Sequence, residues 1–179
     1  LVAAIIPHAD PLHKVTIIPR GLALGLTMQL PFDDKRTYSR DFLAAKLAIL
    51  MGGRAAEKFA FRQTTTGAAN DIEQATEIAR KMVCEWGMSD LGPLKFGISV
   101  ENPFLGKQLT EQQKNYSEKT AQDIDEQIRT FVNKAFEIAK GILEKEKDAL
   151  TRIASALLVY ETLDGEQIRK LVAGESLLS

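Results

Sequence analysis

Hydrophobic residues recur at helical spacing between Asp71 and Gly87, and the acidic residue that opens this stretch falls on its apolar side. Ala75, Ile78 and Met82 follow Asp71 at steps of three and four residues, which places them on one face of a helix. Gly87 follows where a residue free to adopt positive φ commonly ends a helix. The pattern therefore predicts an amphipathic helix whose first turn directs a carboxylate toward the packed side.

Two explanations of the Asp71 side chain fit this pattern. An acid in the first turn complements the helix dipole and accepts hydrogen bonds from free backbone N–H groups. Alternatively, a carboxylate directed inward from a helix start is placed to bind a cation, because a buried charge needs a partner. The pattern alone leaves both explanations open.

The first thirty residues predict a short helix followed by a β-hairpin. Residues 1–6 are apolar throughout and are stopped by Pro7, as at the end of a helix that begins before the chain does. Residues 15–18 and 22–30 have the pattern of strands, and residues 19–21 supply the turn. Small residues occupy one face of the second strand, which either lets a peptide backbone add alongside or marks only tight packing.

The next predicted helix begins at Ser39, a good N-cap, and has a broad apolar face. Gly52 and Gly53 interrupt its pattern, and each costs about 1 kcal/mol relative to alanine inside a helix. Either the helix breaks there or a neighbour approaches its backbone closely. Glu57 lies between this glycine pair and the loop that leads to Asp71.

The second half of the chain predicts three more helices, preceded by a possible short strand at residues 94–100. A heptad pattern runs through Ile124, Ile128, Phe131, Ala135, Ile138 and Ile142. A second amphipathic segment, residues 150–158, follows a charged corner, so we expect a long antiparallel helix pair. The last helix has a capping box between Asp164 and Gln167, and Gly174 ends it.

Composition bounds the class of protein. The 179 residues are 45% hydrophobic and 26% charged and contain no linker, so we expect one mainly α (α+β) domain, residues 1–179. The net charge of −1 gives no electrostatic reason to expect nucleic acid as a partner. Cys84 is the only cysteine, which excludes an internal disulfide and favours a reducing compartment. No apolar run approaches the roughly 20 residues that cross a bilayer, so the chain itself is expected to be soluble.

Few residues are candidates for chemistry. His8 and His13 are separated by Pro11 and do not share a helix face, so loop or strand positions are favoured over metal ligation. Gly106 and Lys107 resemble part of a phosphate loop but lack its other residues. From these residues alone, the chain is a mainly helical domain with one unusual aspartate.

Several motifs, in a fixed order, change this picture. They are residues 1–21, LMGGRAAEKF at 50–59, TTTGAANDIEQAT at 64–76, WGMSDLGPLKFG at 86–97, FLGK at 104–107 and ETLDG at 161–165. Together they resemble the peptidase domain of the ATP-dependent zinc metalloproteases of the FtsH type, over nearly the whole chain.

The resemblance assigns roles to two acidic residues and implies a larger assembly. Asp71 matches the third zinc ligand of that family, and Glu57 matches a carboxylate that orients a zinc-bound histidine from outside the ligand set. In the family, a membrane anchor and an AAA+ module that binds ATP precede the peptidase domain. The homo-hexamer takes in unfolded or membrane proteins, with this domain in the bacterial cytoplasm or an organelle matrix or stroma.

One departure from the family pattern is severe. The His-Glu-x-x-His motif, which supplies two zinc ligands and the general base, does not occur in these residues. In the family it falls immediately before the residue that matches Leu1. We therefore expect the parent protein to be a zinc endopeptidase and this chain to be inactive, with no catalytic residue and weak or absent zinc.

The alternative is a helical assembly or interaction module without peptidase activity. A chain without the motif-bearing helix is also expected to expose apolar surface on the hairpin and on the Asp71 helix, and so to associate.

Overall fold

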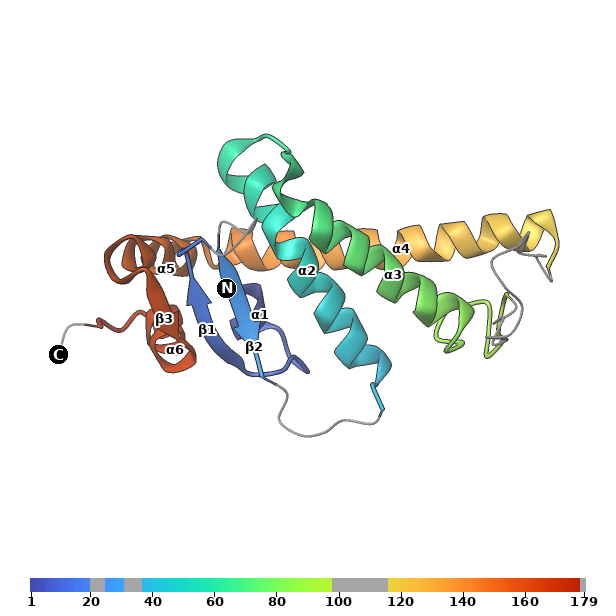
Figure 1. Ribbon diagram of the computed structural model, residues 1–179, viewed down its shortest axis with the longest axis horizontal. Helices are drawn as coiled ribbons and strands as arrows, with labels where there is room; N and C mark the ends of the chain where they lie inside the picture. The colour runs from blue at the N-terminus through green and yellow to red at the C-terminus, as the bar shows by residue number, and fades with distance from the viewer. Residues whose placement is uncertain (20–24, 31–36, 98–115, 178–179) are drawn as a thin grey trace, which may run out of the picture.

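The computed structural model describes residues 1–19, 25–30, 37–97 and 116–177, and within them the chain is mainly α-helical with a small antiparallel sheet (Figure 1). The elements are α1 (Val2–Ile5), β1 (Leu12–Thr16), β2 (Leu26–Gln29), α2 (Arg40–Phe61), η1 (Thr66–Ala68), α3 (Ala69–Cys84), α4 (Glu118–Lys145), α5 (Lys147–Tyr160), β3 (Thr162–Asp164) and α6 (Gly165–Ala173). The predicted fold class is confirmed. Within the described ranges, no helix combines the length and apolar composition needed to cross a membrane.

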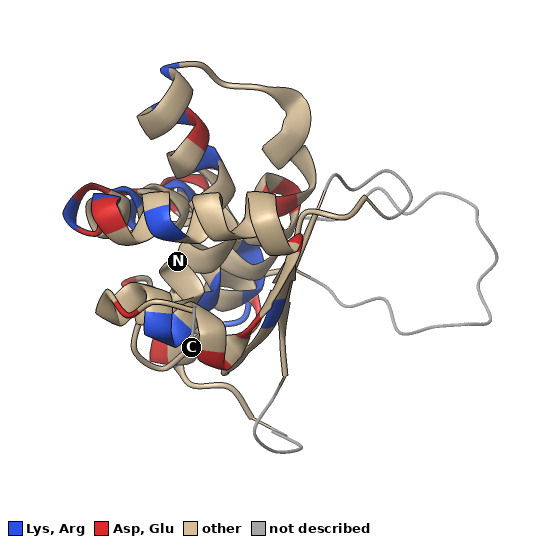
Figure 2. Cartoon of the chain, turned by 90° about the vertical axis from the view of Figure 1, so that its left-hand side faces the viewer, with Lys and Arg blue, Asp and Glu red and all other residues tan. Residues whose placement is uncertain are grey.

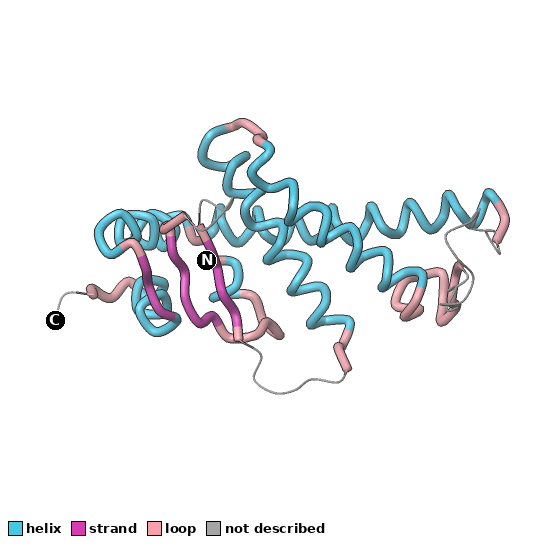
Figure 3. Tube along the Cα trace, in the orientation of Figure 1, coloured by secondary structure: helices cyan, strands magenta, loops and turns pink. Residues whose placement is uncertain are grey.

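The main core lies where α2, α3 and α4 pack together. Buried side chains from all three helices meet there, and Val2 of α1 joins them. The α4 helix is the longest element and runs along the molecule, while the sheet, α5 and α6 gather at one end (Figure 3). A second cluster fills the space between the sheet, α5 and α6, so the chain has two connected packing regions.

The glycine pair does not break α2, which continues from Arg40 to Phe61. Of the two sequence-based alternatives, close approach is the one observed. A Cβ placed on Gly52 would lie 3.4 Å from Cγ2 of Val2, and one on Gly53 would lie 3.7 Å from Oδ2 of Asp71. α1 and α3 therefore lie against α2 at adjacent residues, at distances where a Cβ would be in ordinary van der Waals contact. The predicted N-cap is also present, since the Ser39 side chain accepts a hydrogen bond from the Phe42 N–H at 3.1 Å.

The α3 helix ends at Cys84, before the glycine that was expected to close it. Gly87 does adopt positive φ, at 58°, and a Cβ there would lie 2.7 Å from Cα of Pro93. Glycine is therefore needed at this position for the close approach of Pro93 and not to end α3. Cys84 is half-buried near a small cluster between α3 and α4, and burial raises the pKa of its thiol.

The predicted hairpin is present, with shifted bounds and a third strand. β1 pairs antiparallel with β2 on one side and with β3 on the other, giving the order β2-β1-β3. The small-residue face is used for tight packing at Gly25, where a Cβ would lie 2.8 Å from the Thr16 carbonyl oxygen. β3 was not predicted, because three residues are too few to show a period and their partner strand is distant in sequence.

The two long C-terminal helices are present, but they do not pair with each other as the sequence suggested. α4 packs along α2 and α3, whereas α5 packs mainly against α6 and the sheet. The residues of α4 that are buried therefore differ from the predicted heptad positions. Ala139 and Leu143 are buried, while the expected Ile138 is 38% exposed. On a straight helix of 3.6 residues per turn, positions seven residues apart do not stay on one face. The buried face of α4 is therefore the one that contacts α2 and α3.

The last helix agrees closely with its sequence signals. Asp164 accepts from the Gln167 N–H at 2.8 Å, and the Gln167 side chain accepts from the Asp164 N–H at 2.9 Å, which completes the capping box. Leu163 and Ile168 are both buried in one cluster, and Gly174 ends the helix with φ of 86°.

Some sequence-based expectations fall outside the described residues. They are most of the hairpin turn at 19–21, the FLGK motif at 104–107, and part of the possible strand at 94–100. The described part of that segment, residues 94–97, does not form a strand.

Candidate metal-binding and peptide-binding site

Asp71 lies in the first turn of α3 and is half-buried against α2. Its Oδ2 atom is close to Gly53, where a side chain would fill the intervening space. The carboxylate therefore points toward a neighbouring helix and not into open solvent.

The capping explanation of Asp71 does not account for this geometry. The N-cap of α3 is Ala68, which makes no side-chain cap hydrogen bond, and the described residues contribute no hydrogen bond or ion pair to the Asp71 carboxylate. Burial raises the pKa of this carboxyl group above its ordinary value, because desolvation disfavours the charged form. A half-buried carboxylate of this kind is suited to bind a cation. Its position in the first turn of α3 also complements the helix dipole.

The first residues of the chain pack on α2 next to the residue that faces Asp71. Val2 of α1 is next to Gly52, and Asp71 is next to Gly53, so α1 and the carboxylate contact consecutive residues of α2. The amino group of Leu1 is largely buried, which lowers its pKa.

Glu57 lies one helical turn beyond Gly53 on the same side of α2 and is 19% exposed. Its carboxylate accepts hydrogen bonds from the Thr65 hydroxyl and, at 3.2 Å, from the Thr65 N–H. Arg54 is 3.3 Å away. These hydrogen bonds, with a smaller effect of the Arg54 charge, lower the pKa of Glu57. The structure thus brings Glu57 and Asp71 to the same side of α2, but it gives Glu57 a partner of its own.

The histidines do not join these acids. His8 is an exposed turn residue with φ of 65°, and His13 is an exposed residue of β1. Within the described part of the chain, no three His, Cys, Asp or Glu side chains are close enough together to hold a metal ion. The described residues therefore do not form a complete zinc site, and Asp71 is the one among them that the resemblance assigns as a ligand.

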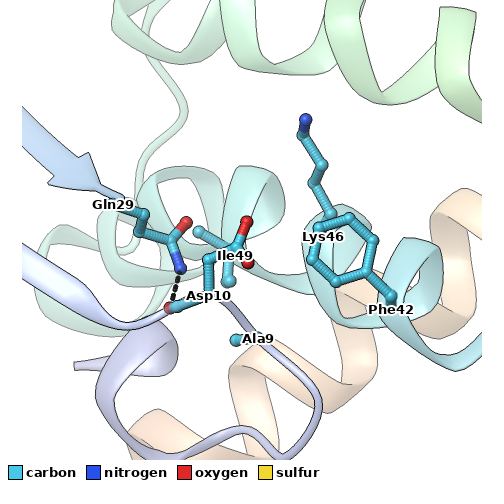
Figure 4. A pocket seen from close by; sticks show the side chains of 6 residues that line it. All are labelled: Ala9, Asp10, Gln29, Phe42, Lys46 and Ile49. Atoms are coloured by element: carbon cyan, nitrogen blue, oxygen red, sulfur yellow. Dashed lines mark hydrogen bonds between the residues drawn. The ribbon is translucent and has the colours of Figure 1, made fainter. Parts of the chain in front are cut away.

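A pocket of about 290 Å³ lies between the hairpin and α2, lined by Ala9, Asp10, Gln29, Phe42, Lys46 and Ile49. Figure 4 shows Gln29 and Asp10 on one side of it and Phe42 and Lys46 on the other; Gln29 donates to the Asp10 carbonyl at 2.7 Å. Lys46, Ile49 and Gly53 follow one side of α2 at steps of three and four residues. The pocket therefore lies on the same side of α2 as the Asp71 carboxylate.

β2 borders this pocket and is an outer strand of the described sheet. Its apolar residues face outward: Leu26 is 42% exposed and Met28 is 37% exposed. An outer strand leaves backbone groups free to pair with an added peptide. Figure 2 shows acidic and basic residues interspersed over the helices.

Sequence reasoning missed the role of Thr65. The motif TTTG was noted only as part of a longer resemblance, although a threonine two residues before a glycine is a common turn signal. The spacing alone could not show that a glutamate eight residues earlier would contact it.

These features define a mainly α domain in which a candidate metal-binding carboxylate and a pocket bordered by an outer strand lie on the same side of α2. The model of peptidase family M41 matches residues 1–171, and the chain belongs to that family. The resemblance found in the sequence is therefore confirmed.

The most similar relatives include ATP-dependent zinc metalloproteases FtsH from three bacteria. The protein of Acidobacterium capsulatum is 52% identical over 177 residues, which is 99% of this chain and 28% of the relative. That of Magnetococcus marinus is 52% identical over 98% of this chain and 26% of the relative. That of Thermotoga maritima is 47% identical over 98% of this chain and 29% of the relative. The chain thus spans less than a third of the length of these proteins.

Proposed function

We propose that this chain is the larger part of the peptidase domain of an ATP-dependent zinc endopeptidase that degrades unfolded or misassembled proteins. The observation that carries the proposal is the half-buried Asp71 carboxylate, which lies beside Gly53 while α1 packs on the preceding residue. Family membership and the names of the relatives support the same activity.

In this proposal, Asp71 supplies one anionic oxygen to a zinc ion whose other ligands come from a His-Glu-x-x-His helix before Leu1. Bound zinc would polarise the peptide carbonyl. The outer edge of β2 would hold the substrate peptide in extended form, with one of its side chains in the pocket between β2 and α2. A hexamer, an ATP-binding AAA+ module and a membrane anchor belong to the parent protein in this proposal, as does a location in the bacterial cytoplasm or an organelle matrix or stroma.

The 179-residue chain itself is proposed to be inactive, because it offers one candidate ligand and no general base. A direct test compares it with a chain extended at Leu1 by the family's His-Glu-x-x-His segment. The extended chain should hydrolyse casein, lose that activity to a chelator and bind stoichiometric zinc, while the 179-residue chain should do none of these.

Asp71→Ala in the extended chain tests the ligand assignment separately. Zinc should fall well below one ion per chain when measured by native mass spectrometry, while Glu73→Ala, an exposed acid on the same helix, should keep it. Full zinc occupancy in Asp71→Ala would remove this residue from the ligand set. Hydrolysis that persists with a chelator would contradict the zinc mechanism as a whole.

An assembly or interaction module without peptidase activity is the second candidate function. Its support is the apolar end of α5, where Leu158 is 79% exposed and Val159 is 73% exposed. An extended chain that binds no zinc but still associates would favour this function.

A further inference from the structure

Three hydrogen bonds of the connection between α2 and α3 meet at Thr65. Its hydroxyl donates to Oε1 of Glu57, its backbone N–H donates to Oε2 of Glu57 at 3.2 Å, and its Oγ1 accepts from the Gly67 N–H at 3.1 Å. One threonine therefore ties the end of α2 to the short helix η1 that leads into α3. We call this set of three hydrogen bonds the Thr65 latch.

The atoms of the Thr65 latch lie close to Gly67 and crowd any side chain at that position. A Cβ on Gly67 would lie 3.2 Å from Oγ1 of Thr65 and 3.3 Å from Oε1 of Glu57, closer than ordinary van der Waals contact. Arg54, at 3.3 Å, neutralises part of the charge on Glu57 and holds the carboxylate toward the loop. Both oxygens of Glu57 are thus engaged with Thr65, which specifies the loop conformation closely.

The latch lies only a short distance along the chain from Asp71. η1 follows Thr65 directly, its last residue Ala68 is 3% exposed, and α3 begins at the next residue. On the α2 side, Glu57 is four residues beyond Gly53, and Gly53 is next to the Asp71 carboxylate. The latch and the carboxylate are therefore attached to neighbouring turns of the same helix.

We propose that Thr65 is a positioning residue, which fixes the start of α3 on α2 and thereby holds the Asp71 carboxylate beside Gly53. The ligand role of Asp71 rests on the proposed function, but the latch itself is a property of the described chain. Ala68 is buried but has no capping side chain, so Thr65 supplies the side-chain hydrogen bonds at this helix start. A metal ligand in the first turn of a helix needs such a support to keep its geometry.

The first part of the test uses the 179-residue chain. Thr65→Val keeps the shape of the side chain and removes the hydroxyl, while Thr65→Ser keeps the hydroxyl. Hydrogen exchange of the Gly67 amide should accelerate at least tenfold in Thr65→Val and stay near the unsubstituted rate in Thr65→Ser. Thr151→Val is the matched control, since that hydroxyl bonds only within α5, to the Lys147 carbonyl. Unchanged exchange in Thr65→Val would show that the latch does not hold the loop.

The second part measures zinc affinity and casein hydrolysis in the extended chain. Loss of an outer support of a metal ligand typically lowers affinity or activity about 10- to 100-fold. Thr65→Val should therefore weaken zinc binding at least tenfold and lower kcat with little change in KM, and Thr65→Ser should restore both. If Thr65→Val does not fold, Gly67→Ala tests the same hydrogen bonds, because its Cβ would crowd Oγ1 of Thr65 and Oε1 of Glu57.

The two hypotheses fail in different ways. Asp71→Ala with unchanged zinc affinity would overturn the ligand assignment in the proposed function. If Asp71→Ala loses zinc while Thr65→Val and Gly67→Ala bind it normally, the ligand assignment holds and the positioning role of Thr65 is wrong.

Discussion

At the residue scale, the environment of Asp71 is the most informative feature of the chain. Its spacing relative to Ala75 and Met82 predicted the side of the helix on which it lies, and the structure places it against α2. The spacing could not show whether a capping bond would satisfy it. That depended on the loop before α3, in which Thr65 donates hydrogen bonds to Glu57.

The raised pKa of Asp71 predicts a pH-dependent effect on stability. The folded chain binds this proton more tightly than the unfolded chain, so stability decreases as pH rises from the ordinary carboxyl range through the raised pKa. Asp71→Asn removes the desolvated charge and should raise the free energy of unfolding at pH 7, by less than about 1 kcal/mol for a partly solvated group. Near pH 3, where the carboxyl group is protonated in both states, the difference should vanish.

Urea denaturation at the two pH values, with a chelator present, measures this effect. Glu73→Gln, at an exposed position of the same helix, serves as the control and should change stability little at either pH. A destabilised Asp71→Asn at pH 7 would mean that the carboxylate makes a favourable interaction in the folded chain.

At the element scale, most signals within a few residues were reliable, with Gly87 as an exception, and signals that depended on a distant partner were not. The capping box of α6 and the N-cap of α2 follow from local sequence, and both are confirmed. The pairing of α4 and the existence of β3 depend on which elements meet in space. An apolar face on a helix shows that this face is buried, but it does not show which neighbouring element buries it.

The capping box predicts a measurable contribution of Asp164. Asp164→Ala removes the acceptor for the Gln167 N–H and should lower the free energy of unfolding by about 1 kcal/mol. Glu166→Ala in the same turn removes only an exposed ion pair with Lys170 and should cost less than about 0.5 kcal/mol. Equal effects of the two substitutions in urea denaturation would mean that the cap is not important for α6.

Two helical glycines should respond in opposite directions to alanine. A Cβ on Gly141, inside α4, meets no atom within 4 Å, so Gly141→Ala should stabilise the chain by about 0.5–1 kcal/mol through helix propensity. A Cβ on Gly165, at the start of α6, would lie 2.0 Å from the Leu12 carbonyl oxygen, so Gly165→Ala must move α6 away from β1 and should destabilise the chain by several kcal/mol.

Thermal denaturation of the two glycine variants checks this contrast. Gly141→Ala should melt a few degrees higher than the unsubstituted chain, and Gly165→Ala should melt far lower or fail to fold. Destabilisation by Gly141→Ala would show that this part of α4 has a neighbour or a bend that needs glycine.

At the scale of the whole molecule, apolar surface is concentrated at the end that carries the sheet and α5. Leu26 and Met28 face outward from β2, and Ile17 donates its N–H to the Glu161 carbonyl at 3.0 Å, which brings the hairpin beside the end of α5. The sequence predicted exposed apolar residues on the hairpin. It did not predict those of α5, because their exposure follows from its docking on α6 and not on α4.

This surface predicts association that depends on concentration. Leu158 and Val159 are consecutive exposed residues at the end of α5, and adjacent Tyr160 is 44% exposed. Because contiguous apolar patches of this kind favour contact between molecules, sedimentation velocity should show dimers or larger species at micromolar concentrations. The double substitution Leu158→Glu and Val159→Lys should shift the chain toward monomer, whereas Ser155→Lys, at an exposed polar position of the same helix, should not. Met28→Lys tests separately whether the exposed apolar residues of β2 contribute to association. An unsubstituted chain that remains a single monomeric species throughout would show that neither apolar region drives association.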